Sequence, residues 1–280
     1  MGKIPRRGAL PEPLFIEEFV RTNRPVIITD AMAGWPAASK WTPEYLAREI
    51  GDASVQVYNY LFTLLDIDTV AGYLARNFGL PEGSVAEEYV RGYVKFKDVD
   101  FVWADELFAQ LAADWSHPYF FPRDGFVLPR CAAQQRLSPV DDVFPYKGLF
   151  LSGRGARTRL HRDPYGTEAV LCQFYGEKRL LIYAPEAASA LMCDGEFADP
   201  ANVDAAKFPH FHSVQPVYDD VLRPGEVLFI PAGWLHDVET LSDSISVTWN
   251  FVHQAHATQY QREVGNSANT FDRDMLSYLS

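Results

Sequence analysis

From residue 148 onward, short apolar or alternating runs separated by turn residues dominate the chain. Runs of this length, bounded by glycine, proline and acidic residues, are typical of β-strands. The predicted strands of this part are Leu149–Leu151, Ala169–Tyr175, Lys178–Tyr183, Val227–Ile230 and Ile245–Phe251. Gly176 and Glu177 separate two of these strands, so we expect a hairpin turn between them.

The first part of the chain mixes helical and strand patterns. Thr42 followed by Pro43, with Gly51 further on, is a typical start and stop of a helix. The predicted helices are Glu12–Arg21, Pro43–Ile50, Leu64–Phe78 and Ala104–Trp115, and the predicted strands are Pro25–Ile28 and Val55–Tyr60. Between Trp115 and Val143, prolines, glycines and aromatic residues predict irregular chain that walls a pocket.

Many short strands after a mixed lead-in predict a mainly β protein with helical additions, built on a sandwich or jelly-roll barrel. The chain has 280 residues, 48% of them hydrophobic, which is ample for a sizeable core. We expect one domain over 1–280, with an α/β lead-in and pocket wall at 1–145, the β core at 146–252 and a polar helical segment at 253–280. That last segment packs on the barrel or makes a homodimer contact, and the sequence leaves both open.

Composition narrows the function classes. The chain carries 37 acidic and 25 basic residues, for a formal charge of −12, which argues against broad nucleic-acid binding. Its cysteines form no close pair, so we expect a reducing, cytoplasmic setting, with Cys172 as a buried thiol. No apolar run reaches membrane-spanning length and no apolar signal core follows the basic N-terminus, so we expect no membrane association.

The residues with the clearest chemistry are His161, Asp163 and His236. On an extended segment His161 and Asp163 project to the same side, and the distant His236 must come from another strand. Two imidazoles and one carboxylate on one face of a metal leave the other face open, which suits non-haem Fe(II) that binds a co-substrate and oxygen together. The same three ligands also bind Zn²⁺ with an activated water.

Lys178 begins a strand whose same-face partners are Leu180 and Ile182. A lysine that faces the core is costly unless an anion meets it, and the carboxylate of a co-substrate would supply that anion. In the alternative reading, Lys178 faces solvent and Arg179 turns inward.

The strand Ile245–Phe251 alternates cleanly, with Ser246, Thr248 and Asn250 on its polar face. Such a face normally meets solvent, but in a ligand-holding barrel it lines the cavity. Thr248 would then donate to the same carboxylate as Lys178, while Asn250 lies deeper or nearer the metal. Thr158, three residues before His161, is a further candidate for the cofactor site.

Weaker signals surround this set. Four arginines crowd one stretch and read either as a solvated loop or as a clamp for an anionic substrate: Arg154, Arg157, Arg159 and Arg162. Tyr93 and Tyr146 are possible donors to substrate or carboxylate. His210 and His212 are expected in a loop, and His253 and His256 lack the glutamate of a zinc-protease motif.

Several motifs now resemble one family in the same order along the chain. Thr158–Thr167 resembles the metal-binding entry of the Jumonji-C and cupin-like hydroxylases, and Phe174–Arg179 resembles their Gly-x-Lys hairpin. Pro224–Glu226, Phe229–His236 and Ser246–Phe251 resemble their closing strands. Arg24–Ile28, Gly34–Pro36 and Trp41–Leu46 resemble their lead-in, so the likeness spans most of the chain.

The resemblance implies a double-stranded β-helix that uses Fe(II) and 2-oxoglutarate. By that resemblance His161, Asp163 and His236 bind iron, and Lys178 pairs with the distal carboxylate of 2-oxoglutarate, with Thr248 and Thr158 nearby. Two positions depart from the family pattern. Ala169–Cys172 holds no asparagine where one is often found, and Leu235 stands where an aromatic residue commonly precedes the distal histidine.

The sequence therefore favours an oxygenase that uses Fe(II), 2-oxoglutarate and O₂ to hydroxylate an unactivated C–H bond. Its substrate is a small, amino-acid-like molecule or a side chain of a peptide or protein. Two other classes remain open: a non-catalytic cupin-like binding or sensor protein, and a zinc-dependent hydrolase that uses the same three ligands. Iron-dependent consumption of 2-oxoglutarate separates the three.

Overall fold

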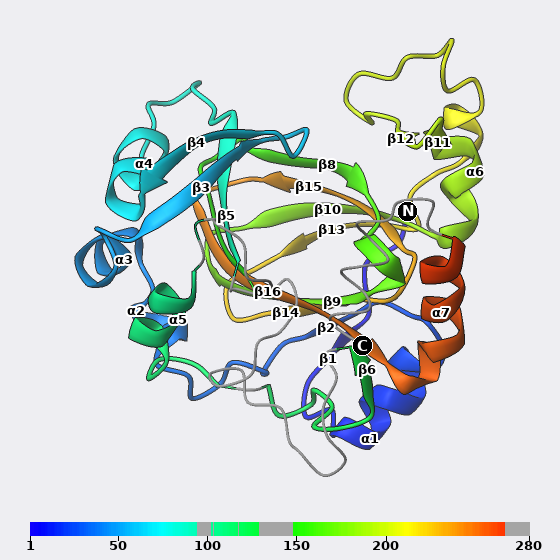
Figure 1. Cartoon of the computed structure of the whole chain (residues 1–280), viewed down its shortest axis with the longest axis horizontal. Helices are drawn as coiled ribbons and strands as arrows, with labels where there is room; N and C mark the ends of the chain where they lie inside the picture. The colour runs from blue at the N-terminus through cyan, green and yellow to red at the C-terminus, as the bar shows by residue number, and fades with distance from the viewer. Residues whose placement is uncertain (94–101, 103, 117, 129–147, 267–280) are drawn as a thin grey trace.

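Two β-sheets lie against each other in the computed structural model, which describes residues 1–93, 102, 104–116, 118–128 and 148–266 (Figure 1). The larger sheet has the strand order β1-β2-β14-β9-β16-β7-β5-β3-β4, with β6 paired to β16. The smaller sheet has the order β13-β10-β15-β8. The predicted fold class, a jelly-roll core with helical additions, is confirmed.

Eight strands form this core, and along the chain they pass back and forth between the sheets. β7 (Gly148–Ser152), β9 (Glu168–Tyr175), β14 (Val227–Ile230) and β16 (Ser244–His253) belong to the larger sheet. β8 (Arg157–His161), β10 (Lys178–Tyr183), β13 (Tyr218–Leu222) and β15 (Leu235–Thr240) make the smaller one. All the pairings among these eight strands are antiparallel.

The lead-in extends the larger sheet and covers its outer face. Its strands are β1 (Arg6–Arg7), β2 (Val26–Ile28), β3 (Ser54–Asn59), β4 (Leu64–Thr69), β5 (Glu88–Tyr93) and β6 (Phe126–Leu128). Its helices are α1 (Glu12–Phe15), which continues as a π-helical turn over Ile16–Val20, α2 (Ala37–Lys40), α3 (Pro43–Glu49), α4 (Val70–Asn77) and α5 (Asp105–Leu111). Short elements complete the fold: α6 (Ala188–Leu191), β11 (Met192–Cys193), β12 (Glu196–Phe197) and α7 (Ala257–Asn266).

The main hydrophobic core lies between the larger sheet and the lead-in. Val247, Trp249 and Phe251 of β16 share one buried cluster with Trp41 and Phe174. Trp41 and Phe174 pack with ring centroids 4.4 Å apart, a spacing typical of favourable aromatic pairs. Because the apolar face of β16 is buried against the lead-in, its polar face is turned into the space between the two sheets.

One predicted helix is wrong over its first half. Leu64–Phe78 was expected to be helical, but Leu64–Thr69 pairs with β3 as the edge strand β4, and only Val70–Asn77 is helical. The helix begins after Thr69, whose hydroxyl accepts a hydrogen bond from the Gly72 amide. Leu64, Leu65 and Ile67 are exposed, so the spacing of these apolar residues does not correspond to the buried face of a helix.

The predicted hairpin at Gly176–Glu177 is also wrong. β9 and β10 flank this turn, but β9 pairs with β14 and β16, whereas β10 pairs with β13 and β15. The turn therefore carries the chain from one sheet to the other. Gly176 has a φ of +69°, and a Cβ there would lie 1.9 Å from the main-chain oxygen of Asp243, so the crossing needs glycine.

The other predicted elements are confirmed with shifted ends. The helix capped by Thr42 is α3, and the Thr42 side chain accepts from the Tyr45 amide. The predicted helix Ala104–Trp115 is shorter, at Asp105–Leu111. β16 runs one residue beyond the predicted core boundary at 252, and α7 supplies the expected helical segment up to Asn266. Within the stretch expected to be irregular, Phe126–Leu128 forms β6, while 129–143 lies outside the described residues.

Candidate metal centre

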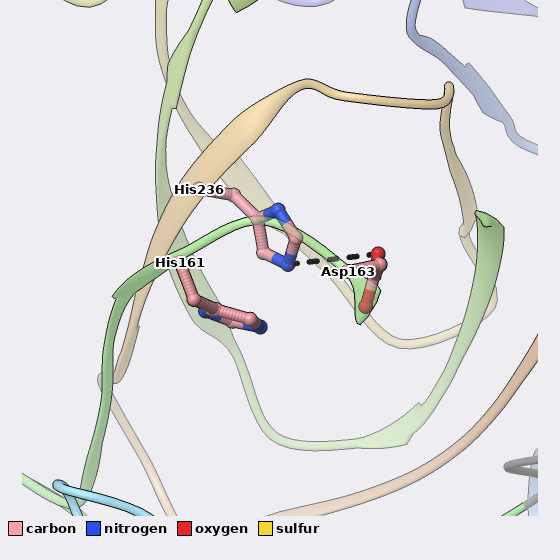
Figure 2. Close-up of side chains that lie close together, drawn as sticks. All are labelled: His161, Asp163 and His236. Atoms are coloured by element: carbon pink, nitrogen blue, oxygen red, sulfur yellow. Dashed lines mark ion pairs between the residues drawn. The ribbon is translucent and has the colours of Figure 1, made fainter. Parts of the chain in front are cut away.

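His161 and His236 are cross-strand partners on β8 and β15 in the smaller sheet. Asp163 follows β8 by two residues in extended backbone, which turns its carboxylate toward the same space. One potential ligand atom from each residue lies within 4.8 Å of the other two. Figure 2 shows the arrangement, with Nε2 of His236 4.0 Å from Oδ2 of Asp163. The structure thus brings together the three residues predicted from sequence.

Main-chain carbonyl groups orient both imidazoles. Nδ1 of His161 lies 2.8 Å from the Arg159 oxygen, and Nδ1 of His236 lies 3.3 Å from the Trp234 oxygen. A carbonyl only accepts, so each Nδ1 carries the proton and each Nε2 keeps a free lone pair. Burial, together with the neighbouring His236, lowers the pKa of His161 well below its ordinary value, which favours the neutral ligand form. This donor set fits a divalent metal with open coordination positions.

All seven predicted site residues line one pocket between the two sheets. They are Thr158, His161, Asp163, Lys178, His236, Thr248 and Asn250. The remaining wall is formed by Phe62, Arg91, Tyr93, Phe150, Ala169, Leu171, Ile230, Val238 and Ser246. Ala169 and Leu171 make this wall apolar at the place where the family often has an asparagine.

A β-bulge explains how Thr158 and His161 both reach the pocket. Residues three apart on a regular strand face opposite ways, but β8 holds an extra residue opposite β15. His161 pairs with His236, and Thr158 pairs with Val238. The bulge therefore turns Thr158 and His161 to the same face of the sheet, although they are three residues apart.

Lys178 is buried, with 6% of its surface exposed, as the inward-facing interpretation predicts. Its Nζ donates to Oγ of Ser152 at 2.9 Å and lies 3.5 Å from Oγ1 of Thr240. No carboxylate of the described residues pairs with it, and burial lowers its pKa to about 8. Arg179 instead turns outward and forms an ion pair with Asp219.

The polar face of β16 lines the cavity and is not open solvent-facing surface. Thr248 donates to the Val170 carbonyl at 2.9 Å, so its hydroxyl proton is already used by the protein. Nδ2 of Asn250 lies 3.3 Å from the Thr167 hydroxyl. The buried Ser246 hydroxyl, which lines the pocket, has no hydrogen-bond partner among the described residues and is free to donate to a ligand.

The four crowded arginines do not act together. Arg154 donates to the carbonyls of Pro81 and Ser84, Arg157 pairs with Asp199 and Asp237, and Arg162 pairs with Glu263 of α7. Arg159 forms no ion pair with the described residues, and its guanidinium lies over the ring of Phe62, which lines the pocket. The clamp interpretation is therefore wrong for three of the four.

Arg91 is the pocket residue that sequence reasoning missed most clearly. It lies on β5, a strand that was not predicted, and contacts Tyr93 by two hydrogen bonds. The signal was present as the alternation Tyr89, Arg91, Tyr93, which on a strand places these three side chains on one face. Phe62 in the pocket wall and the Lys178 partners Ser152 and Thr240 were also missed, while Tyr146 lies outside the described residues.

The remaining histidines have other surroundings. His210 and His212 are exposed in the chain before β13, as expected. His256 binds the buried carboxylate of Glu168 at 2.8 Å, and Glu168 also accepts from the His253 amide. This cluster fastens the end of β16 and the start of α7 to β9. Cys172 is fully buried, as predicted.

Among the described helices, none is long and apolar enough to cross a membrane.

Comparison with known proteins gives relatives for most of the chain. It is 24% identical over 258 residues to the 2-oxoglutarate and iron-dependent oxygenase JMJD4 of Gallus gallus, covering 85% of this chain and 57% of that protein. It is 25% identical over 255 residues to the arginine-specific demethylase JMJ22 of Arabidopsis thaliana, covering 86% of this chain and 44% of that protein. The chain thus spans about half the length of these two relatives.

A third relative is matched over more of its own length. The human tRNA wybutosine-synthesizing protein 5 is 25% identical over 266 residues, with 88% of this chain and 77% of that protein covered. A family model described as the cupin-like domain matches residues 11–63 and 71–257, which is most of the chain. Together with the two-sheet core and the order of its motifs, this match shows that the chain belongs to the cupin-like domain family.

Proposed function

We propose that this protein is an Fe(II)- and 2-oxoglutarate-dependent oxygenase, with His161, Asp163 and His236 as its metal ligands. The observation that carries the proposal is that these three side chains share one pocket with a buried lysine, Lys178, which pairs with no carboxylate of the described residues. A metal site alone would suit several chemistries. A buried cation beside it also calls for an anionic ligand, because an unpaired buried charge is costly.

The chain's own residues would hold the co-substrate at two ends. The carbonyl-oriented imidazoles and Asp163 hold the metal, which the keto-acid end of 2-oxoglutarate would chelate. At the other end Lys178 would pair with the distal carboxylate, assisted by the free hydroxyl of Ser246 and by Thr158. Tyr89 lies beside Thr158, and because burial raises its pKa to about 12, it is a neutral donor.

Thr248 takes a different part from the one expected. The Thr248 hydroxyl donates its hydrogen bond to the Val170 carbonyl, so Thr248 can only accept hydrogen bonds from a ligand in the pocket. We propose that Ser246 donates to the carboxylate in its place. Asn250 lies further along the same strand face, where its link to Thr167 supports the loop that follows Asp163.

When bound, Fe(II) and 2-oxoglutarate supply oxidation by O₂, in which 2-oxoglutarate is converted to succinate and CO₂ and one oxygen atom enters a substrate C–H bond. The protein would position the reactants and exclude water from the cavity. Ala169, Leu171, Ile230 and Val238 line the cavity with apolar groups and keep water from competing with substrate. We propose hydroxylation of a small, amino-acid-like molecule or of a peptide or protein side chain.

The relatives support this chemistry at a coarse level. One is named as an iron- and 2-oxoglutarate-dependent oxygenase, another as a demethylase and a third as a tRNA wybutosine-synthesizing protein. Hydroxylation as the outcome, and the substrate itself, are our proposals for this chain.

The test is anaerobic binding of Fe(II) and 2-oxoglutarate to the purified full chain, followed by visible absorption. Chelation of the keto acid by Fe(II) gives a metal-to-ligand charge-transfer band, which we expect in the unaltered protein. We expect His161→Ala to abolish the band and Lys178→Ala to shift its half-saturation to at least tenfold more 2-oxoglutarate, since a charged hydrogen bond contributes about 1.5–3 kcal/mol.

Matched controls come from residues of the same type that do not line the pocket. His212→Ala and Lys207→Ala alter side chains outside the pocket, so both should keep the band and its titration midpoint. Absence of the band in the unaltered protein, or tight zinc binding with no response to 2-oxoglutarate, would contradict the proposal.

A further inference from the structure

Two arginines gather around one aromatic ring at the metal pocket. The guanidinium carbon of Arg91 lies 5.0 Å from the centre of the Phe62 ring, and that of Arg159 lies 5.6 Å from the same centre. The Phe62 ring meets the metal-binding candidate His161 edge-on, with centroids 5.1 Å apart. Arg91 and Phe62 both line the metal pocket, and Arg159 stacks on Phe62 beside it.

The turn that presents Phe62 is held in a specific shape. Phe62 joins β3 to β4 with a φ of +62°, a left-handed conformation that costs a non-glycine residue about 1–2 kcal/mol. Asn59 stabilises the turn, since its side-chain oxygen accepts from the amides of Leu61 and Thr63. The fold thus maintains a strained residue to bring this ring to the pocket.

Within the described part of the chain, neither arginine has a partner for all of its N–H donors. Nε and Nη2 of Arg91 donate to the Tyr93 hydroxyl at 3.2 and 2.7 Å, while its Nη1 has no partner among the described residues. The side chain of Arg159 makes no hydrogen bond to the described residues, and its Nε is buried. A guanidinium offers five N–H donors, so most of the donors of this pair are free to bind a ligand.

No carboxylate of the described residues forms an ion pair with either cation; Glu196, which pairs with Lys207, also feels the charge of Arg159. By contrast Arg6, Arg157 and Arg179 each form ion pairs with acidic side chains. In a chain with a formal charge of −12, acidic groups are abundant, yet none in the described part of the chain forms an ion pair with Arg91 or Arg159. Planar guanidinium groups that are free to donate match carboxylate and phosphate oxygens.

We propose that Arg91 and Arg159 form an anion-binding subsite for the primary substrate, which carries a carboxylate or phosphate group that docks beside Phe62. This inference rests on the proposed function, in which Lys178 holds the co-substrate and leaves the arginine pair to the substrate. The aromatic rings of Tyr58, Phe62 and Tyr93 hold the Arg91 guanidinium in place by cation–π contacts of 5.0–5.4 Å.

Isothermal titration calorimetry with three capped amino acids tests the subsite. The probes are N-acetyl aspartate amide, its neutral isostere N-acetyl asparagine amide, and N-acetyl phosphoserine amide. Each is titrated into the full chain with saturating Mn(II) and 2-oxoglutarate, and again without either. We expect at least one anionic probe to bind at least about tenfold more tightly than the neutral one. The aspartate and phosphoserine arms distinguish a carboxylate from a phosphate ligand.

Arg91→Gln and Arg159→Gln should each reduce this preference by about tenfold, since each removes a charged donor. Arg48→Gln is the matched control, because Arg48 also stacks on a tyrosine, Tyr45, but lies on α3 away from the pocket. A purely structural role would lower the melting temperature of the variants and leave the preference for anions unchanged. If Arg91→Gln does not fold, Arg91→Lys and Arg159→Gln replace it, and both should weaken the preference.

Equal binding of charged and neutral probes, or a preference that survives both substitutions, overturns the subsite. Loss in only one variant assigns the anion to that arginine and contradicts the pair. Failure of Mn(II) and 2-oxoglutarate to bind would overturn the proposed function instead, and the titrations without them would still report on the arginines.

Discussion

At the residue scale, the centre depends on how the protein assigns protons. The carbonyls of Arg159 and Trp234 hold the Nδ1 protons of the two histidines, and this leaves both Nε2 atoms available to a metal. The histidines bind a metal in their neutral form, whereas Lys178 must be protonated to attract a carboxylate. Its burial works against that charge.

The lowered pKa of Lys178 predicts a pH dependence for co-substrate binding. Burial moves this pKa from 10.5 to about 8, so the ammonium form is complete well below pH 8 and is lost above it. Because the carboxylate binds the ammonium form, the dissociation constant of 2-oxoglutarate should be flat between pH 6.5 and 7.5. It should then rise toward about tenfold per pH unit above 8.

Anaerobic titration of the Fe(II) complex at a series of pH values measures this slope. Lys178→Arg keeps a positive charge throughout the range, so its residual affinity should not fall in the same way. A slope in the arginine variant equal to that of the unaltered protein would assign the pH effect to another group.

The same shift has a consequence for stability. The folded pKa of Lys178 lies below its unfolded value, so between about pH 8 and 10.5 the unfolded chain binds more protons. This group alone therefore makes the ligand-free protein more stable as the pH rises through that window. Bound 2-oxoglutarate would reduce the effect, since a carboxylate partner raises the pKa again.

At the element scale, the crossings between sheets place the site. The turn at Gly176 and Glu177 delivers Lys178 to the start of β10, opposite Thr240 and Leu222. The bulge in β8 delivers Thr158 to the same cavity as His161. Both are departures from regular strand geometry, and each moves the side chain of a candidate site residue.

Substitution of Gly176 tests this crossing. We expect Gly176→Ala to lower the free energy of unfolding by about 3 kcal/mol or more, because the new Cβ would lie 1.9 Å from the Asp243 oxygen and the backbone must move. Gly225→Ala is the matched control, since Gly225 also has a positive φ, of +88°, but a Cβ there meets nothing within 4 Å. Its cost should be only about 1–2 kcal/mol of backbone strain.

Urea unfolding of both variants measures the difference. The Gly176 variant should also bind 2-oxoglutarate more weakly, because Lys178 lies two residues further along. Equal losses of stability in the two variants would show that the close approach to Asp243 is relieved without cost.

At the scale of the whole molecule, the charge of the pocket opposes the charge of the chain. The protein is strongly acidic, yet Lys178 and Arg91 line one cavity and Arg159 stacks on Phe62 in its wall, and none of the three forms an ion pair with a described residue. A small anion inside the pocket is attracted by the local potential of these cations, because the more distant charges of the chain are screened by salt. The expected absence of nucleic-acid partners, the single domain over 1–280 and a homodimer through the C-terminal segment stay predictions.

Ligand binding should stabilise the whole fold, because the pocket joins both sheets. Mn(II) and 2-oxoglutarate together, each at about 100 times its dissociation constant, should raise the melting temperature by about 5 °C or more. Asp163→Ala removes a metal ligand candidate and should abolish the gain, whereas the exposed Asp52→Ala should retain it. An equal gain in both variants would separate the stabilisation from the proposed centre.

The sequence by itself determined the local chemistry of this protein. The alternation of β16, the ligand triplet and the strand that begins at Lys178 are short-range patterns, and the periods of strand and side-chain direction make them readable. The order of motifs also indicated the family, because together they are far more specific than any one of them.

Only the tertiary structure decided which polar groups meet. Leu64–Thr69 forms a strand because β3 pairs with it. The turn at Gly176 and Glu177 crosses between the sheets because β9 and β10 pair with other strands and not with each other. Arg91 and Arg159 reach Phe62 from different strands, and Ser246 is left free while Thr248 is bonded. These outcomes depend on contacts between residues distant in sequence, which local periodicity does not specify.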